Sequence, residues 1–190
     1  MIKLHSAKIY DFTQADYAKM YSLLDCAIKE KIDKKHSEKD KQLSLAGYIL
    51  LWRTVKEMYN KDTVKITFNE HGKPLCDFCF FSISHSVDRI VCAVSDAPIG
   101  IDIQQIREIK QHENYKLLSS KESIYVNEKT QNLSGRYIEV FSKKEAAIKM
   151  LGLSLGDGAS IDVFSKKYNF KTEYFDNFVQ TICTQNVSIV

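Results

Sequence analysis

The stretch Pro98-Ile99-Gly100-Ile101-Asp102-Ile103-Gln104 is the most informative part of this chain. Its apolar residues at 99, 101 and 103 alternate with the remaining positions, which predicts an extended strand with two unlike faces. Asp102 and Gln104 therefore lie on one face. Gly100 shares that face and has no side chain, so another group can approach the backbone beside Asp102. A half-buried strand whose polar face meets water is the alternative interpretation.

A second stretch, Arg136 to Leu151, predicts a helix. Its apolar residues follow the three-and-four spacing of one buried stripe: Tyr137, Val140, Phe141, Ile148 and Leu151. Lys144 and Glu145 fall on or beside this stripe. A carboxylate there must be paired, hydrogen-bonded or bound to a cation, because burying it alone is costly. Lys149 lies one turn beyond Glu145, so an ordinary i,i+4 ion pair remains open as an explanation.

Two further motifs precede the strand. Ser82-Ile83-Ser84-His85-Ser86 is followed after a polar turn by another β-type run, which predicts a hairpin with Ser84 and His85 near the end of its first strand. Upstream, Gly72-Lys73-Pro74 predicts a turn that holds the Lys73 ammonium on a constrained loop.

Taken in this order, the four motifs resemble those of the 4'-phosphopantetheinyl transferases of the surfactin-synthetase-activating type, over roughly residues 30 to 156. The resemblance implies a holo-[acyl-carrier-protein] synthase type of enzyme. Such an enzyme moves the phosphopantetheine arm of coenzyme A to a serine hydroxyl of an acyl or peptidyl carrier protein and releases adenosine 3',5'-bisphosphate. The resemblance also implies Mg²⁺ as the metal cofactor.

The same resemblance suggests roles for individual residues. Asp102 and Glu145 match the metal ligands, and Lys149 matches the lysine that reaches the phosphates. Positions that match the coenzyme A contacts are Lys31, Ser44, Lys73, Pro74, Ser84 and His85, with Lys73 and His85 expected to clamp the 3'-phosphate. Because attack by the carrier serine builds negative charge on phosphate oxygens, we expect Glu145 to act as the general base and Lys149 to stabilise the leaving phosphate.

The chain departs from the family pattern at three positions. Gln104 stands where a second acid is common two residues after the strand aspartate, so the predicted metal site has two carboxylates, and the Gln104 amide oxygen could still bind the metal or a metal-bound water. Phe141 replaces a tryptophan, and Leu43 replaces an arginine. Two alternatives stay open: a non-catalytic coenzyme A-binding relative, and a generic two-carboxylate metal-dependent phosphotransferase or nuclease.

The predicted fold is α+β, with two similar halves in the pseudo-two-fold arrangement that the resemblance implies. We place the halves at residues 1–97 and 98–190, each with helices and an antiparallel sheet. The expected strands lie at 2–12, 64–68, 79–85, 89–95, 99–104, 161–165, 170–175 and 178–190. The expected helices lie at 14–30, 39–59, 113–128 and 133–151.

Composition limits the possible partners and the compartment. The net charge of +3 is too small to favour nucleic acid as a partner, and the lysines between 29 and 41 alternate with acids. No secretory h-region or membrane-spanning stretch is evident, so we expect a cytoplasmic monomer without a membrane partner. The odd number of cysteines, five, fits a reducing compartment, and Cys76 and Cys79 form an isolated CxxC that could be a redox pair or half of a zinc site.

Overall fold

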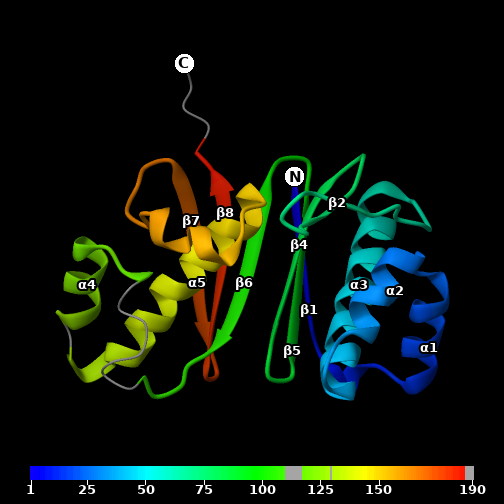
Figure 1. The fold of residues 1–190 in the computed structure, drawn as a ribbon, viewed down its shortest axis with the longest axis horizontal. Helices are drawn as coiled ribbons and strands as arrows, with labels where there is room; N and C mark the ends of the chain where they lie inside the picture. The colour runs from blue at the N-terminus through cyan, green and yellow to red at the C-terminus, as the bar shows by residue number, and fades with distance from the viewer. Residues whose placement is uncertain (110–116, 129, 187–190) are drawn as a thin grey trace.

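The computed structural model describes residues 1–109, 117–128 and 130–186 (Figure 1). The N-terminal half starts with one strand, passes through three helices, and ends in an antiparallel hairpin. Its elements are β1 (Ile2–Lys8), the 3-10 turn η1 (Ile9–Asp11), α1 (Gln14–Leu23), α2 (Cys26–Asp33), α3 (Glu38–Tyr59), β2 (Thr67–Phe68), β3 (Pro74–Leu75), β4 (Phe80–Ser86) and β5 (Arg89–Ser95).

In its described residues, the C-terminal half repeats this plan with two helices in place of three. Its elements are β6 (Ile99–Gln105), α4 (Ser120–Asn127), the 3-10 turn η3 (Thr130–Asn132), α5 (Leu133–Leu151), the 3-10 turn η4 (Leu155–Ser160), β7 (Tyr168–Phe175) and β8 (Phe178–Gln185). The boundary that we place at residue 97 falls in the short connection between β5 and β6.

Each half has its own antiparallel sheet, and the strand orders correspond. The orders are β1-β5-β4 and β6-β8-β7, so in both sheets the last strand of the half lies between the first strand and the middle one. The strands occupy the middle of the molecule, with α1, α2 and α3 outside one sheet and α5 packed on the other sheet, with α4 beside α5 (Figure 1). The α+β fold with antiparallel sheets is confirmed.

The two sheets meet along β4 and β6, which run in the same direction without backbone pairing. Instead, three serine hydroxyls of β4 accept backbone N–H groups of β6: Ser82 from Ile101 (3.0 Å), Ser84 from Ile103 (3.3 Å) and Ser86 from Gln105 (3.1 Å). Behind this ladder, Val91 and Ala93 of β5 pack with Ile101 of β6 in a small apolar core between the sheets. The serines therefore satisfy a strand edge that would otherwise be buried with unpaired donors.

Four sequence predictions about secondary structure were wrong. The expected strand at 2–12 ends at Lys8, and residues 9–11 form the 3-10 turn η1, in which the Lys8 backbone N–H donates to the Asp11 carboxylate. The stretch 14–30 is two helices, since Asp25 has an extended backbone and its carbonyl oxygen accepts the first hydrogen bonds of α2. The expected strand at 161–165 is a turn in which the Asp162 carboxylate accepts the Phe164 N–H. The expected strand at 64–68 keeps only the two residues of β2, because its antiparallel partner β3 ends at Leu75 and residues 64–66 have no strand beside them to pair with in the described part of the chain.

The expected helix at 113–128 and the strand ending at 190 lie partly outside the described residues; within them the helix begins at Ser120 and the strand ends at Gln185. The helix predicted at 39–59 begins one residue earlier, and that at 133–151 has the expected bounds.

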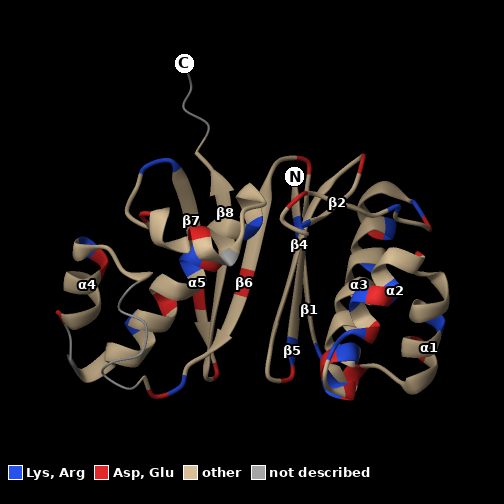
Figure 2. Cartoon of the chain, in the orientation of Figure 1, with Lys and Arg blue, Asp and Glu red and all other residues tan. Residues whose placement is uncertain are grey.

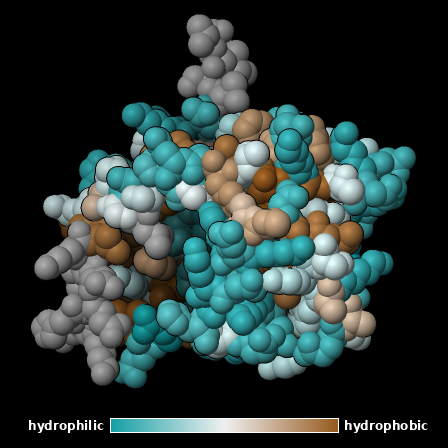
Figure 3. Space-filling view, turned by 45° about the vertical axis from the view of Figure 1, so that its right-hand side comes forward, coloured by the Kyte–Doolittle hydropathy of each residue, from teal (hydrophilic) through white to brown (hydrophobic). Residues whose placement is uncertain are grey.

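Surface charge is mixed rather than segregated. Acidic and basic positions are interspersed along α2 and α3 (Figure 2), and hydrophilic residues cover most of the face in Figure 3, with smaller hydrophobic patches between them. Among the described residues, no helix combines the length and the apolar character that spanning a membrane requires.

Candidate active site

Asp102 lies at the centre of the junction between the halves. It is fully buried on β6, and both carboxylate oxygens accept hydrogen bonds. Oδ1 accepts the Ser84 hydroxyl (2.9 Å) and the Lys149 ammonium (2.6 Å), and Oδ2 accepts the Gln104 side-chain amide (3.0 Å). The Lys149 ammonium also donates to Ser84 Oγ at 2.8 Å. Both halves therefore hold the Asp102 carboxylate in place. This arrangement differs from the alternative interpretation, a half-buried strand whose polar face meets water.

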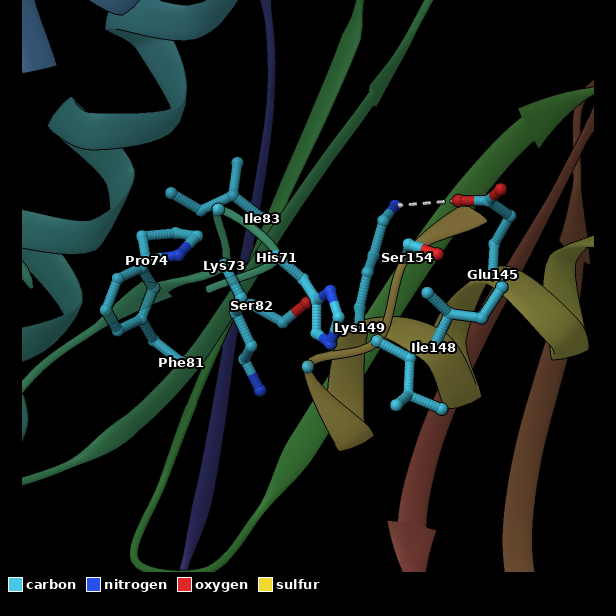
Figure 4. A pocket seen from close by; sticks show the side chains of 13 residues that line it. His71, Lys73, Pro74, Phe81, Ser82, Ile83, Glu145, Ile148, Lys149 and Ser154 are labelled. Carbon is cyan, nitrogen blue, oxygen red and sulfur yellow. Dashed lines mark ion pairs between the residues drawn. The ribbon is translucent and has the colours of Figure 1, made fainter. Parts of the chain in front are cut away.

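The missing side chain at Gly100 explains how α5 reaches this carboxylate. A Cβ atom added at Gly100 would lie 1.8 Å from the carbonyl oxygen of Ala146, so the helix backbone rests directly on the strand. This contact confirms the expectation that the backbone beside Asp102 is open to close approach. It also brings Glu145 and Lys149 to the Asp102 side of α5, with the Lys149 ammonium 4.0 Å from the Glu145 carboxylate (Figure 4).

Glu145 is half-buried and borders a cavity. Burial, which is the largest influence, and the negative charge of Asp102 raise the pKa of Glu145 above its ordinary value, although the Lys149 ammonium acts in the opposite direction. A raised pKa makes the ionised carboxylate a better proton acceptor.

The donor set at this junction suits a hard cation. Asp102 and Glu145 supply carboxylate oxygens, and Mg²⁺ commonly takes one or two carboxylates from the protein and the rest of its ligands from water and substrate phosphates. In this structure the cation that contacts both carboxylates is the Lys149 ammonium. No cluster of three or more His, Cys, Asp or Glu side chains suited to a metal occurs among the described residues. The residues present thus fit a two-carboxylate site.

A cavity of about 480 Å³ opens beside Glu145. Its walls come from both halves: the β2–β3 hairpin and β4 on one side, and the end of α5 on the other (Figure 4). The lining residues are His71, Gly72, Lys73, Pro74, Phe81, Ser82, Ile83, Glu145, Ile148, Lys149, Gly152, Leu153 and Ser154.

A second cavity, of about 210 Å³, adjoins the first on the N-terminal side. The two share Gly72, Pro74 and Ile83 in their walls. The second is lined by Lys31, Ile32, Lys35, Ser44, Tyr48, Phe68, Gly72, Pro74, Ile83 and His85. The pair of cavities thus runs from Lys31, Lys35 and His85 to the Glu145 carboxylate and the Lys149 ammonium of α5.

His85 forms no hydrogen bond through its ring within the part of the chain that the structure describes, and it borders the second cavity. Burial, followed by the positive charges of Lys35 and Lys149, lowers the pKa of His85, while Asp40 and Asp102 oppose the shift. The ring is therefore neutral near pH 7 and available to a ligand that supplies negative charge.

The remaining predicted contacts lie around these cavities, but not all as expected. Lys73 borders the first cavity and His85 the second, and the Lys73 ammonium donates to the Met150 carbonyl oxygen at 2.9 Å. Lys31 lies over the Phe68 ring, 3.4 Å from its centroid, and Ser44 donates back to the carbonyl oxygen of its own helix. Ser84 touches Asp102 and does not line either cavity.

Sequence reasoning missed two residues at this site. Lys35 borders the second cavity, but it stands in a run of mixed charges in which no spacing distinguishes one lysine from another. Asn69 anchors the loop that carries Lys73, through hydrogen bonds from the His71 and Lys73 amides. An Asn ahead of a Gly-containing turn is a recognisable turn signal.

Comparison of the sequence with known proteins identifies one family. A family model described as the 4'-phosphopantetheinyl transferase superfamily matches residues 98–185. The chain is 37% identical over 118 residues to the 4'-phosphopantetheinyl transferase gsp of Aneurinibacillus migulanus, covering 60% of this chain and 50% of that protein. It is 32% identical over 127 residues to psf-1 of Bacillus pumilus, covering 64% and 54%.

A 4'-phosphopantetheinyl transferase of Bacillus subtilis is 30% identical over 154 residues, covering 77% of this chain and 67% of that protein. The chain spans about half the length of the first two relatives and two thirds of the third. The family suggested by the sequence motifs is confirmed: the chain belongs to the 4'-phosphopantetheinyl transferase superfamily.

Proposed function

We propose that this protein transfers the 4'-phosphopantetheine group of coenzyme A to a serine hydroxyl of an acyl or peptidyl carrier protein, as a holo-[acyl-carrier-protein] synthase. One observation carries the proposal: two adjoining cavities run from Lys31, Lys35 and His85 to Glu145 and Lys149, and the Lys149 ammonium pairs with the buried Asp102 carboxylate. The family membership supports it, and the relatives compared above are themselves named as 4'-phosphopantetheinyl transferases.

The N-terminal half would bind the nucleotide. A 3'-phosphate in the second cavity would meet His85, Lys35 and Lys31, with the Ser44 hydroxyl beside them. Hydrogen bonds from cationic groups to phosphate oxygens are about twice as strong as those between neutral groups. Pro74 borders both cavities and would support the coenzyme A molecule where it passes from one to the other.

The C-terminal half would carry out the transfer. The carrier serine oxygen attacks the β-phosphorus of coenzyme A, and the bond from that phosphorus to the bridging oxygen of the leaving bisphosphate breaks. Glu145, directly or through a water, takes the proton of the serine hydroxyl, and Lys149 places positive charge near the departing phosphate. Ser84 and Gln104 hold the Asp102 carboxylate in position.

Asp102 and Glu145 are the residues that would hold Mg²⁺, since they provide the hard oxygen ligands of the site. When bound, the metal supplies positive charge to the pyrophosphate oxygens and lowers the barrier to transfer. Gln104 presents its amide nitrogen to Asp102, so it would support that ligand rather than add a charge.

Incubation with coenzyme A, Mg²⁺ and an apo acyl carrier or an apo peptidyl carrier, followed by mass spectrometry of the carrier, tests the function. A mass gain of one phosphopantetheine group that disappears when the carrier serine is replaced by Ala supports it. Binding of coenzyme A without a mass gain on any carrier indicates the non-catalytic relative. Failure to bind coenzyme A contradicts the proposal.

A cytoplasmic, monomeric state remains a prediction within this proposal. Sedimentation of the purified protein over a range of concentrations tests the monomer, and fractionation of cells that express it tests the compartment. A dimer, or recovery in the membrane fraction, would contradict these predictions.

A further inference from the structure

The β2–β3 hairpin borders both cavities, yet it has little structure of its own. Only two residue pairs join its strands, Thr67 with Leu75 and Phe68 with Pro74. An isolated two-stranded hairpin is at best marginally stable in water, even when its strands are longer. The position of the loop Gly72-Lys73-Pro74 must therefore depend on contacts with the rest of the molecule.

Two side chains of the hairpin bind the C-terminal end of α5. The Asn69 amide nitrogen donates to the Gly152 carbonyl oxygen at 2.8 Å, and the Lys73 ammonium donates to the Met150 carbonyl oxygen at 2.9 Å. The last carbonyl groups of a helix have no partner within it, and a cation there is favoured by the helix dipole. The hairpin thus caps the helix that carries Glu145 and Lys149.

The Asn69 side chain joins its own turn to that helix. Its Oδ1 accepts the backbone N–H groups of His71 (3.1 Å) and Lys73 (2.8 Å), while its Nδ2 faces Gly152. Gly152 has φ of 72°, and a Cβ added there would lie 2.9 Å from Asn69 Nδ2. The close fit leaves the amide little room for another orientation.

A third contact holds the hairpin from the N-terminal half. The Lys31 ammonium of α2 lies 3.4 Å from the centroid of the Phe68 ring and donates to the Gly72 carbonyl oxygen at 3.4 Å. The loop is therefore held between α2 and α5. Its position sets how the nucleotide side of the site lies relative to the catalytic helix.

We propose that Asn69 is a positioning residue for coenzyme A, and that Lys73 shares this role by binding the end of α5 rather than a phosphate. The inference rests on the proposed function, because it names the ligand of the cavities. It predicts that loss of the Asn69–Gly152 hydrogen bond weakens binding even when the local turn is intact.

Two substitutions of Asn69 separate positioning from turn formation. Asn69→Asp keeps an oxygen that accepts the His71 and Lys73 amides but loses the donor to Gly152, whereas Asn69→Ala loses both. We expect each to raise the dissociation constant of coenzyme A by about tenfold, measured by calorimetry without carrier. Asn177→Asp is the matched control, since it loses an amide–carbonyl hydrogen bond of the same 2.8 Å length, to Ile106, away from both cavities.

Lys73→Met tests the proposed positioning role of Lys73. It keeps most of the aliphatic stem and removes the ammonium that binds the Met150 carbonyl oxygen. If Lys73 positions the loop, coenzyme A and dephospho-coenzyme A lose affinity by the same factor. A loss confined to coenzyme A would assign the ammonium to the 3'-phosphate and overturn this role for Lys73.

Amide hydrogen exchange on the free protein gives a measurement that does not depend on the proposed function. In Asn69→Asp, amides of residues 70–73 and 75 should exchange faster while those of β4 and β5 stay unchanged. Wild-type affinity for coenzyme A in Asn69→Asp, or unchanged exchange in the loop, overturns the positioning role. If the wild-type protein does not bind coenzyme A at all, the proposed function fails instead, and exchange still reports whether Asn69 holds the loop.

Discussion

The N-terminal and C-terminal halves share a strand order but differ in what they bury. In the described part of the C-terminal half, four charged side chains are buried: Asp102, Glu122, Glu139 and Lys144. In the N-terminal half, the buried polar side chains among the described residues are the hydroxyls of Thr54, Ser82, Ser84 and Ser95. The same topology therefore supports an apolar, neutral interior in one half and a charged one in the other.

This difference fits distinct roles for the two halves. Buried charges need partners, and α5 supplies them through Lys144 for Glu122, Lys143 for Glu139 and Lys149 for Asp102. The N-terminal half instead keeps Lys31 and Lys35 at the border of a cavity, where they remain available to a ligand. We interpret the first arrangement as suited to chemistry and the second as suited to binding.

The largest effect is expected at Asp102. Asp102→Asn keeps the shape of the side chain and an oxygen that can accept hydrogen bonds, but it removes the negative charge. Turnover should fall on the order of 10³-fold, as when a preorganised electrostatic group is lost from an active site. Steady-state transfer rates and the thermal unfolding midpoint should be measured together. A variant with near-wild-type turnover would show that the buried charge is structural.

Lys144 and Lys149 offer a comparison within one helix. Lys144→Met leaves the Glu122 carboxylate buried without its ammonium, which lies 2.9 Å away, and should cost about 3–5 kcal/mol of unfolding free energy. Lys149→Met should lower transfer with a smaller loss of stability, because the Lys149 side chain is 27% exposed against 3% for Lys144. Urea unfolding of both variants measures this. If the two variants lose the same unfolding free energy, Lys144 and Lys149 do not differ in their contribution to stability.

His85 tests the binding role of the N-terminal half. His85→Ala should weaken coenzyme A by about tenfold to a hundredfold and dephospho-coenzyme A much less, because the ring is assigned to the 3'-phosphate. Equal losses for the two ligands would place His85 away from that phosphate.

The lowered pKa of His85 adds a pH dependence. The ring is neutral in the free protein near pH 7, and a phosphate raises its pKa, so binding takes up a proton between the two pKa values. Affinity for coenzyme A should therefore decrease as the pH rises through this interval. Calorimetry in buffers of different ionisation enthalpy measures the proton uptake, which should be absent in His85→Ala.

The smallest effect is expected at Gln104. Gln104→Glu replaces an amide that donates to Asp102 with a carboxylate that repels it, so the metal-free protein should unfold at a slightly lower temperature. Added Mg²⁺ should restore the midpoint and be needed at lower concentration for half-maximal activity than in wild type. Gln104→Ala should stay active with a modestly higher Mg²⁺ requirement. If it is as inactive as Asp102→Asn, Gln104 is itself essential.

The sequence predicted the elements whose periodicity is long and regular. α3, α5 and the strand with Asp102 were identified because their patterns extend over several repeats. The break at Asp25 and the turn at Asp162 were missed because a local hydrogen-bonding side chain or an extended backbone outweighed a hydrophobic pattern. Both errors fall away from the site.

The site was predicted as a set of residues but not as an arrangement. Asp102, Glu145 and Lys149 were identified, whereas the direct contact between Lys149 and Asp102 depends on α5 resting on Gly100. The serine ladder requires β4 to lie beside β6, and the contacts of Lys73 and Asn69 require the hairpin to meet α5. Such contacts depend on tertiary packing that residue spacing does not encode.

Coenzyme A binding and phosphopantetheine transfer, measured in parallel on Glu145→Gln and His85→Ala, test the division between the halves most directly. We predict that Glu145→Gln binds coenzyme A like the wild type in the absence of metal, yet transfers at less than about 1% of the wild-type rate at saturating coenzyme A. His85→Ala should bind weakly but approach the wild-type rate once coenzyme A saturates it. Loss of binding in Glu145→Gln together with a low saturated rate in His85→Ala would contradict this account.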